Sequence, residues 1–452
     1  MSNPKISRFI VLLLCLGICF RVILFLVNPP NNSYDDHMEV IQLYSEDFER
    51  PLPFECWQAY QPPAYYYIGA IFLKCADFLG LKGACKWKIV QSINCILSLL
   101  VLVLFSKILT KIGVNNGLKI LYLSFLAFLP RDIFTSLMVG NDYLLIFSSV
   151  AVLFYFVKLL KTKPEISKRL TLLNFLGLSF FALLGSFTKQ HGLLLLILPI
   201  SITISHLYIN RRFVLTTLMP ILIVVLVFAS SDELWKYKQT GHFLVSNQDY
   251  YDYAENQFPG SLNGVRFFSF ELNKLLENPF ISRETSASLP TEIFARIFFD
   301  YEWRFLDPNR YFTYYVGRLG YLLGIIWLLY FSISTYFWVK NNYTQHLKSK
   351  GDLINYISLF LVGILFTLVP VVQTIRYPYF SSMKAMFIVP GIIILGALHA
   401  TICKNIKAVP NVFCLITIMN FLYGVILLVA ICLSMGGTLD YLHGPLWPYP
   451  TN

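Results

Sequence analysis

The sequence predicts an all-α, polytopic membrane protein with about eleven transmembrane helices, because long apolar runs recur along the whole chain. Of its 452 residues, 56% are hydrophobic and only 13% are charged. A soluble protein of this length carries about twice that charged fraction. We therefore expect one integral membrane unit over residues 1–452. Its two larger hydrophilic segments are a first outer loop with juxtamembrane helices at 28–88 and a medium-sized outer loop at 231–310.

The formal net charge of +11 does not indicate a nucleic-acid partner. The lysines and arginines lie in short loops between the apolar runs, which is a signal of membrane topology. The nine cysteines have no metal-ligand spacing. Cys56 and Cys85 could form a disulfide if the first loop faces an oxidising compartment.

The first predicted span covers residues 9–27, about the length that a bilayer core requires. Arg21 lies near its far end, where the side chain can extend to the lipid headgroups. Lys5 and Arg8 precede the run and predict a cytoplasmic N-terminus. A cleaved signal peptide is the alternative, but Asn28-Pro29-Pro30 is a poor cleavage site.

Apolar runs predict the later spans at residues 89–106, 119–134, 143–156, 172–186, 192–209, 213–230, 319–339, 353–370, 383–402 and 412–433. Segment 64–81 is the doubtful one. If it does not cross, the basic loops between the later spans share the side of the N-terminus, and only Lys82, Lys86 and Lys88 are misplaced. If it crosses, those loops face outward. We therefore predict that 64–81 forms an amphipathic helix in the outer interface.

This topology gathers most of the acids, histidines and tyrosines of the chain on the outward side. The long outer loop contains two amphipathic stretches rich in aromatic residues, at 265–276 and 291–305. Such stretches suit the headgroup zone or an interfacial lid.

Two motifs in the first outer loop indicate chemistry. Asp35-Asp36-His37-Met38-Glu39 follows the first span, and Gln61-Pro62-Pro63-Ala64-Tyr65-Tyr66 ends the loop. Gly140-Asn141-Asp142 opens a later span, Gly185-Ser186-Phe187-Thr188-Lys189 closes another, and Arg376-Tyr377 precedes a late one. In these features the chain resembles the type-C glycosyltransferase superfamily, which includes protein O-mannosyltransferases, lipid A aminoarabinose transferases and oligosaccharyltransferase catalytic subunits.

The resemblance implies a polyprenyl-phosphate-linked sugar as donor and an inverting glycosyl transfer among membrane lipids. It places the active site on the non-cytosolic face of a bacterial plasma membrane or of the endoplasmic reticulum. The sugar, and whether the acceptor is a lipid, a glycan or a protein, stay open.

The chemistry of such a transfer suggests roles for the charged residues. An acceptor hydroxyl is a poor nucleophile and needs a carboxylate to take its proton, which makes Asp35 or Asp36 the candidate catalytic base. The leaving phosphate needs fixed cations, and we expect Arg376 to supply one, with Lys189 and Lys384 in reserve. In the superfamily the base is usually the first acid after the first span, which corresponds to Asp35.

Each assignment has a structural alternative. Ser33-x-x-Asp36 and Asp36-x-x-Glu39 both fit a helix capping box, so one of the two aspartates is expected to be structural. In the structural alternative, Lys189 and His191 merely mark the membrane interface, and Arg376 merely anchors the chain to lipid phosphate.

The predicted substrate-binding residues are His37, Glu39, Tyr65, Asp142, Lys189, His191, Arg376 and Lys384. Asp142 could instead cap the span that it opens. Tyr65 belongs to a proline-rich turn that reads as architectural. His37, Glu39 and an aspartate could hold a divalent ion, but neighbouring residues converge poorly on one metal. We therefore assign no metal ligands and no certain cofactor.

Two other classes of protein stay open, a polytopic transporter and a non-catalytic subunit of a glycan-assembly complex. Transporters place ionisable residues near the middle of the membrane and contain internal repeats. Here the ionisable residues gather in the outer loops and no repeat is visible. The sequence therefore favours an enzyme.

Overall fold

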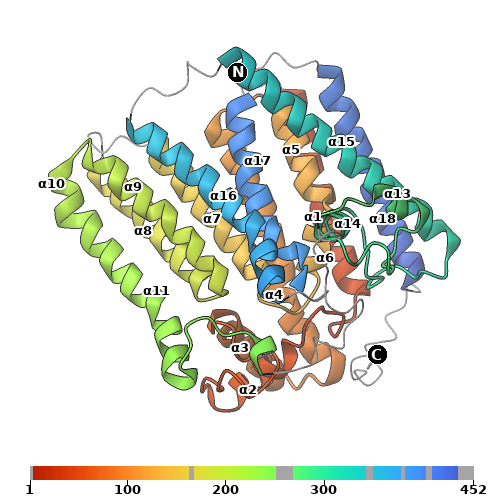
Figure 1. Cartoon of the computed structure of the whole chain (residues 1–452), viewed down its shortest axis with the longest axis horizontal. Coiled ribbons are helices and arrows are strands. Elements are labelled where there is room, and N and C mark those ends of the chain that lie inside the picture. The colour runs from red at the N-terminus through yellow and green to blue at the C-terminus, as the bar shows by residue number, and fades with distance from the viewer. Residues whose placement is uncertain are drawn as a thin grey trace.

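The computed structural model describes residues 4–161, 167–250, 268–342, 350–377, 382–403 and 410–435. Every regular element in these ranges is helical (Figure 1). Within them, ten stretches are long and apolar enough to cross a membrane: Arg8–Val27, Gly83–Ile112, Asp142–Lys161, Lys168–Ser186, Gln190–Leu207, Arg211–Thr240, Tyr311–Phe337, Leu353–Arg376, Ala385–Cys403 and Val412–Ser434. The protein is a multi-pass integral membrane protein, as predicted.

The helices of the first half are α1 (Pro4–Val27), α2 (Met38–Asp47), α3 (Ala64–Phe78), α4 (Gly83–Ile112), α5 (Asn116–Phe128), α6 (Pro130–Ser136), α7 (Asp142–Lys161), α8 (Lys168–Ser186), η1 (Gln190–Leu196), α9 (Ile197–Leu207) and α10 (Arg211–Phe213). Those of the second half are η2 (Val214–Leu218), α11 (Met219–Thr240), η3 (Asn247–Asp249), α13 (Leu272–Glu277), α14 (Leu289–Phe298), α15 (Tyr311–Asn342), α16 (Lys350–Arg376), η6 (Ala385–Ile388), α17 (Val389–Cys403) and α18 (Pro410–Ser434). Several are longer than the predicted spans, because lysines and other good helix formers continue the helix beyond its apolar part.

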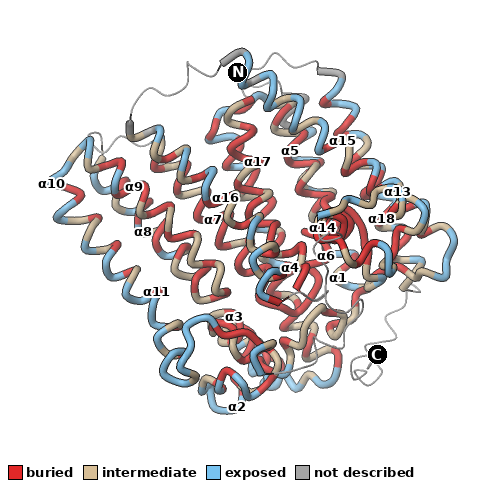
Figure 2. Tube along the Cα trace, viewed as in Figure 1, coloured by how far each residue is buried: buried red, intermediate tan, exposed pale blue. Residues whose placement is uncertain are grey.

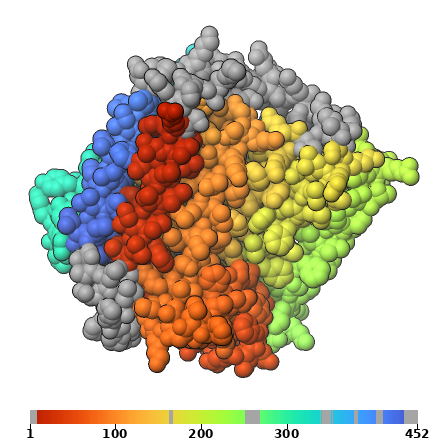
Figure 3. Space-filling model, turned by 180° about the vertical axis from the view of Figure 1, so that it is seen from behind, coloured from red at the N-terminus to blue at the C-terminus, as the bar shows by residue number. Residues whose placement is uncertain are grey.

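The centre of the bundle is formed by α7 and α17. In the most apolar 18-residue stretch of each of their spans, 72% of the residues are buried, against 33% in α1. Figure 2 shows the buried segments concentrated in this middle region. Helix α1 lies along the surface between α18 and the orange helices of the α4–α5 region (Figure 3), and it packs against α4, α5 and α18.

The predicted span 119–134 is not one of these ten stretches, because it is divided between α5 and α6. Pro130 starts α6, and Leu129 before it is extended (ψ 113°). Proline disfavours the helical conformation in the residue before it and has no N–H to donate, so α5 ends here. The backbone carbonyls at the end of α5 therefore lack their usual helical partners.

Arg21 fills this gap. Its guanidinium donates to the carbonyls of Ala127 (2.8 Å) and Leu126 (3.2 Å), and it forms an ion pair with Asp132 at 2.6 Å. Both charged side chains have zero exposure, and Asp132 also accepts a hydrogen bond from Tyr143. The expectation that Arg21 extends to the headgroups is wrong, because the break at Pro130 provides a buried set of acceptors.

Helices α2 and α3 lie together at one end of the bundle, called here the α2–α3 end (Figure 1). Helix α3 has 15 residues, which at 1.5 Å per residue is about 22 Å and too short to cross a hydrocarbon core. The segment 64–81 is thus a short helix packed on α2 and α4, and it is not a span.

The helices of the long loop, α13 and α14, pack on α15, and α14 also packs on α6 and η6. The predicted amphipathic stretches of the loop correspond to α13 and α14, although residues 265–267 lie outside the described ranges. Arg131 of α6 donates to the carbonyl of Arg296 at 2.8 Å and so fixes α14 on α6. Cys56 and Cys85 are both free, so the considered disulfide is not formed.

The buried Arg21–Asp132 pair leads to a stability prediction. Arg21→Met leaves an unpaired carboxylate in the interior, which we expect to cost about 3–5 kcal/mol of unfolding free energy. The double variant Arg21→Met/Asp132→Asn should recover part of that loss, because no buried charge remains. Thermal unfolding in detergent micelles, followed by tryptophan fluorescence, measures both effects.

The matched control is Lys74→Met, since Lys74 is exposed on α3 and the change should leave the midpoint unmoved. A double variant whose loss equals the sum of the two single losses would contradict the paired-charge explanation.

Candidate active site

A cleft lies where the α1–α2 loop meets the turn between α6 and α7. Its empty volume is about 260 Å³, including the part that is open to solvent. Its walls are formed by Tyr34, Asp35, His37, Thr135, Met138, Val139, Gly140, Asp142 and Met386. Three of the predicted site residues, Asp35, His37 and Asp142, are therefore brought together.

The α1–α2 loop is held at several points, and this fixes Asp35. Asn32 donates to the Asn28 side chain (2.7 Å) and to the carbonyl of Arg304 (2.9 Å). Ser33 donates to the carbonyl of Asp35 at 2.7 Å. The backbone N–H of His37 donates to the same carbonyl at 3.1 Å. Asp35 is thus held by a compact turn directly before α2.

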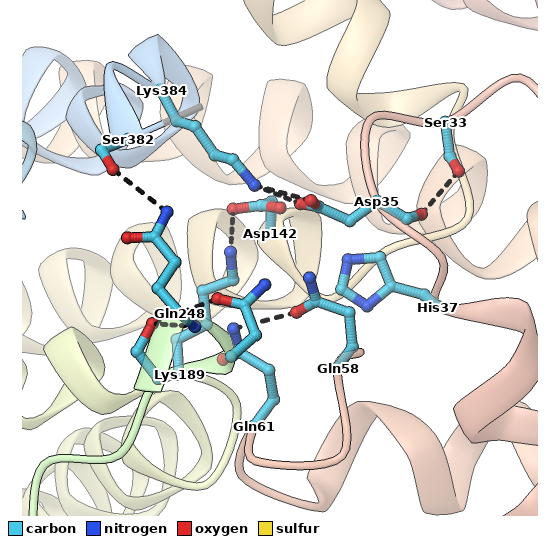
Figure 4. A network of polar contacts seen from close by, with 12 residues as sticks. Ser33, Asp35, His37, Gln58, Gln61, Asp142, Lys189, Gln248, Ser382 and Lys384 are labelled. Atoms are coloured by element: carbon cyan, nitrogen blue, oxygen red, sulfur yellow. Dashed lines mark hydrogen bonds and ion pairs between the residues drawn. The ribbon is translucent and has the colours of Figure 1, made fainter. Parts of the chain in front are cut away.

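Lys384 is the direct partner of Asp35. Its Nζ lies 2.7 Å from Oδ1 and 2.5 Å from Oδ2 of the carboxylate (Figure 4). Burial raises the pKa of Asp35, but the charge of Lys384, the charge of His37 in the acidic range where it is protonated, and the hydrogen bond from Lys384 outweigh burial and lower the pKa to about 2. The carboxylate is therefore ionised at neutral pH.

A second ion pair lies beside the first. Lys189 Nζ is 2.5 Å from Asp142 Oδ1, and both side chains are more than nine-tenths buried. Burial lowers the pKa of Lys189, although Asp142 acts in the opposite direction. Lys189 follows α8 in a tight turn, where a Cβ on Gly192 would lie 2.0 Å from the carbonyl oxygen of Gly185. Only glycine fits there, so the turn that presents Lys189 depends on it.

His37 forms the neutral wall of the cleft. Its Nδ1 lies 2.9 Å from the Tyr66 hydroxyl, and the two rings are stacked. Burial lowers the pKa of His37 to about 4, so the imidazole is neutral at pH 7. A Cβ on Gly140 would lie 3.1 Å from His37 Cδ2, so the glycine lets the turn approach the ring.

Sequence reasoning missed the groups that hold the α6–α7 turn. Gln91 of α4 donates to the carbonyl of Leu137 at 2.6 Å. Asn94, one turn later, donates to the carbonyls of Met138 and Gly140, each at 2.7 Å. Two amides three residues apart within an apolar span were the available signal, because polar groups in a membrane helix usually bond a neighbour.

More amides lie on the side of the lysines. Gln61 donates to Gln58 at 3.2 Å, and Gln248 donates to the Ser382 hydroxyl at 3.3 Å. Figure 4 shows these side chains beside the two lysine–aspartate pairs. The surroundings of Lys384 and Lys189 are thus neutral and able to form hydrogen bonds.

Other predicted residues do not line this cleft. The Asp36 carboxylate accepts from the backbone N–H of Glu39 at 3.2 Å, as a helix cap does, and Glu39 itself is exposed. The Tyr65 hydroxyl accepts from the Gly140 N–H at 3.0 Å, which agrees with its architectural alternative. The His191 ring lies against the rings of Phe366 and Phe387.

Arg376 is also placed differently from the expectation. It is largely exposed and lies 3.4 Å from Asp249, which in turn accepts from the Tyr377 hydroxyl at 2.6 Å. It also donates to the carbonyl of Leu244 at 3.1 Å. Arg376 thus ties the end of α16 to the long loop, and the cation beside Asp35 is Lys384, which the sequence analysis kept in reserve.

No group of three His, Cys, Asp or Glu side chains within the described ranges is arranged to hold a metal ion. His37, Glu39 and an aspartate, which could have held a divalent ion, do not converge, because Glu39 is exposed and is absent from the cleft wall.

Comparison with solved structures gives several matches at low sequence identity. ArnT from Cupriavidus metallidurans is 13% identical, and the match covers 88% of this chain and 77% of that one, with a TM-score of 0.41. ArnT bound to undecaprenyl phosphate gives the same identity and coverage with a TM-score of 0.39.

The archaeal oligosaccharyltransferase AglB from Archaeoglobus fulgidus, in complex with an inhibitory peptide and a dolichol-phosphate, is 12% identical. The match covers 96% of this chain and 56% of AglB, with a TM-score of 0.43. No protein-family model and no curated protein sequence matches the chain.

The buried neutral imidazole of His37 predicts a pH dependence of stability. Folding lowers its pKa from 6.5 to about 4. The stabilisation is therefore fully present above pH 6.5 and is lost as the pH falls through about 4. His37→Gln removes this titration, so the gap in unfolding midpoint between the natural protein and the variant should narrow over that interval.

The natural protein and the variant are compared at each pH because Glu292 also titrates in this pH range. Burial raises the pKa of Glu292 to about 7, so its effect on stability changes with pH in the opposite direction to that of His37. His242→Gln, which alters an exposed histidine outside the cleft, is the control for the substitution itself. A pH-independent gap for His37→Gln would mean that His37 does not fold in the neutral form.

Proposed function

We propose that this protein is a membrane glycosyltransferase that moves a sugar from a polyprenyl-phosphate-linked donor to an acceptor hydroxyl. The observation that carries the proposal is an ionised carboxylate, Asp35, at a small cleft and in contact with a lysine, at one end of a bundle of membrane spans. A donor with an isoprenoid tail stays in the bilayer, so its phosphate must be met at such a boundary.

Asp35 acts as the general base. A carboxylate with a low pKa is deprotonated at neutral pH and can accept the proton of an attacking hydroxyl. Of the two neighbouring aspartates, only Asp35 lines the cleft, whereas Asp36 caps α2. We propose that the transfer inverts the anomeric carbon, as the resemblance of the sequence to type-C glycosyltransferases implies.

The two lysines bind the phosphate. Charge-assisted hydrogen bonds from ammonium groups to phosphate oxygens are strong, and the developing charge of the leaving group strengthens them. Lys384 and Lys189 lie next to the cleft but are absent from its wall, which carries Asp35 and Asp142. We therefore assign the cleft to the acceptor and the lysine side to the phosphate.

The active site lies on the non-cytosolic side in this proposal. The basic ends of α4, α7 and α10, with Lys107, Lys111, Lys158, Arg211 and Arg212, are at the bundle end opposite α2 and α3 (Figure 1). Short loops rich in lysine and arginine favour the cytoplasm. The membrane is then a bacterial plasma membrane or the endoplasmic reticulum.

The decisive test compares two adjacent aspartates. Asp35→Asn should lower sugar transfer by at least about 10²-fold, because the acceptor proton then has no base. Asp36→Asn should keep near-normal transfer and lose at most about 1 kcal/mol of stability, since Asp36 serves as a cap. Transfer is measured as radiolabel leaving a panel of undecaprenyl- and dolichyl-phosphate sugars in membranes that contain the acceptor.

Both variants are checked for normal membrane insertion and unfolding midpoint. Normal transfer by a stable Asp35→Asn protein would rule out Asp35 as the base. A loss confined to Asp36→Asn would move the base to the neighbouring carboxylate.

A further inference from the structure

The single positive charge of Lys384 would have to pair with two anions, the Asp35 carboxylate and the donor phosphate. The ammonium group of this lysine contacts both carboxylate oxygens of Asp35, at 2.7 and 2.5 Å. In the proposed reaction it also binds the donor phosphate. An ammonium that holds the carboxylate this closely cannot at the same time be fully available to a phosphate oxygen.

The neighbouring lysine does not relieve this competition. Lys189 is committed to Asp142 at 2.5 Å, with both side chains more than nine-tenths buried, and its ammonium lies 4.7 Å from the centre of the Phe387 ring. The two lysines and two aspartates sum to zero charge. A phosphate that approaches this group therefore meets cations already neutralised by carboxylates.

Lys384 is the more movable of the two cations. Its side chain keeps 19% of its exposure, against 4% for Lys189, and it comes from the short segment between Ser382 and η6. A lysine has a flexible four-carbon stem and acts as a point charge, so it can turn from one anion to another nearby.

We propose that the donor phosphate takes Lys384 from Asp35, and that this transfer of the counter-ion makes Asp35 a working base only when the donor is bound. The inference rests on the proposed function and adds an order of events to it. The donor binds first, and only then is the acceptor hydroxyl activated.

The charges balance through the reaction. The acceptor oxygen forms a bond to the anomeric carbon, and its proton passes to Asp35. The bond from the anomeric carbon to the phosphate oxygen breaks, and the electron pair stays on that oxygen. Asp35 loses one negative charge while the leaving polyprenyl phosphate gains one, and Lys384, already bound to the phosphate, neutralises the charge that develops there.

Other groups around Asp35 are consistent with this role. His37 is neutral, while Lys189 acts on Asp35 from a distance and is held by Asp142. Burial is the main cause that raises the pKa of the Tyr60 and Tyr66 hydroxyls, and the negative charge of Asp35 raises both further. Both hydroxyls therefore stay protonated at neutral pH. Lys384 is thus the direct cationic contact of Asp35 in the described part of the chain.

The test uses binding of a phosphate and does not require turnover. The full-length protein is placed in phosphatidylcholine nanodiscs, and its affinity for undecaprenyl phosphate and for dolichyl phosphate is measured. Asp35→Asn leaves Lys384 with an uncompensated charge, so this variant, although inactive, should bind the phosphate about tenfold more tightly than the natural protein. Lys384→Met should bind about tenfold more weakly, because it lacks the cation.

Asp77→Asn is the matched control. It removes the carboxylate from another lysine–aspartate pair, Lys86–Asp77 at 2.7 Å, which is partly exposed and lies outside the site. Its affinity should equal that of the natural protein. Asp35→Ser serves as the second variant if Asp35→Asn does not fold, with the same expected gain.

Each outcome bears on a separate claim. If the natural protein binds polyprenyl phosphate and Asp35→Asn binds it equally or less tightly, the counter-ion transfer is wrong and the proposed function stands. If the natural protein binds neither polyprenyl phosphate, the proposed function is wrong and the inference falls with it.

Discussion

The pairing of charges beside the cleft is the constraint on which the rest of the structure depends. Four side chains that form two ion pairs lie in one small, largely buried region, and isolated charges in such surroundings are strongly unfavourable. They are stable because each lysine contacts an aspartate, Lys384 with Asp35 and Lys189 with Asp142. The four residues come from loops and helix ends that are far apart in sequence. The surrounding helices must therefore hold four chain segments in register at once.

The same principle explains the break between α5 and α6. Pro130 ends α5 inside the protein and leaves carbonyls without partners. Arg21 and Asp132 meet this need together, because the arginine donates to the free carbonyls and the aspartate neutralises it. The break also allows the chain after α6 to turn back toward His37, where Gly140 comes close to the ring. A local defect in one helix thus shapes the wall of the cleft.

The sequence predicted the parts of this structure that depend on local composition. Apolar length located ten of the eleven predicted spans, whereas 119–134 is divided between α5 and α6, and segment 64–81 is not a span, as the pattern of basic loops indicated. The doublet at Asp35 and Asp36 marked the cleft, but only the fold distinguishes the residue that lines it from the residue that caps α2. The motifs around Asp142 and Lys189 were recognised separately, and their contact was not foreseen.

Long-range partners could not be read from the chain. Lys384 lies 349 residues from Asp35, and Arg21 lies 111 residues from Asp132. Lys384 and Arg376 are both cations near the end of α16, eight residues apart (384 − 376), and Arg376 instead binds Asp249. Which cation meets which anion is decided by helix packing, and a hydropathy pattern contains no such information.

The hydrogen bonds from α4 to the α6–α7 turn limit where the sequence of this protein can take an insertion. Gln91 and Asn94 reach the α6–α7 turn only because both project from the same face of α4. An α-helix rotates by about 100° per residue. One inserted residue upstream within α4 would therefore swing both amides away from the carbonyls they bind. The connection between α3 and α4 can change in length during evolution, whereas the rotational phase of α4 cannot.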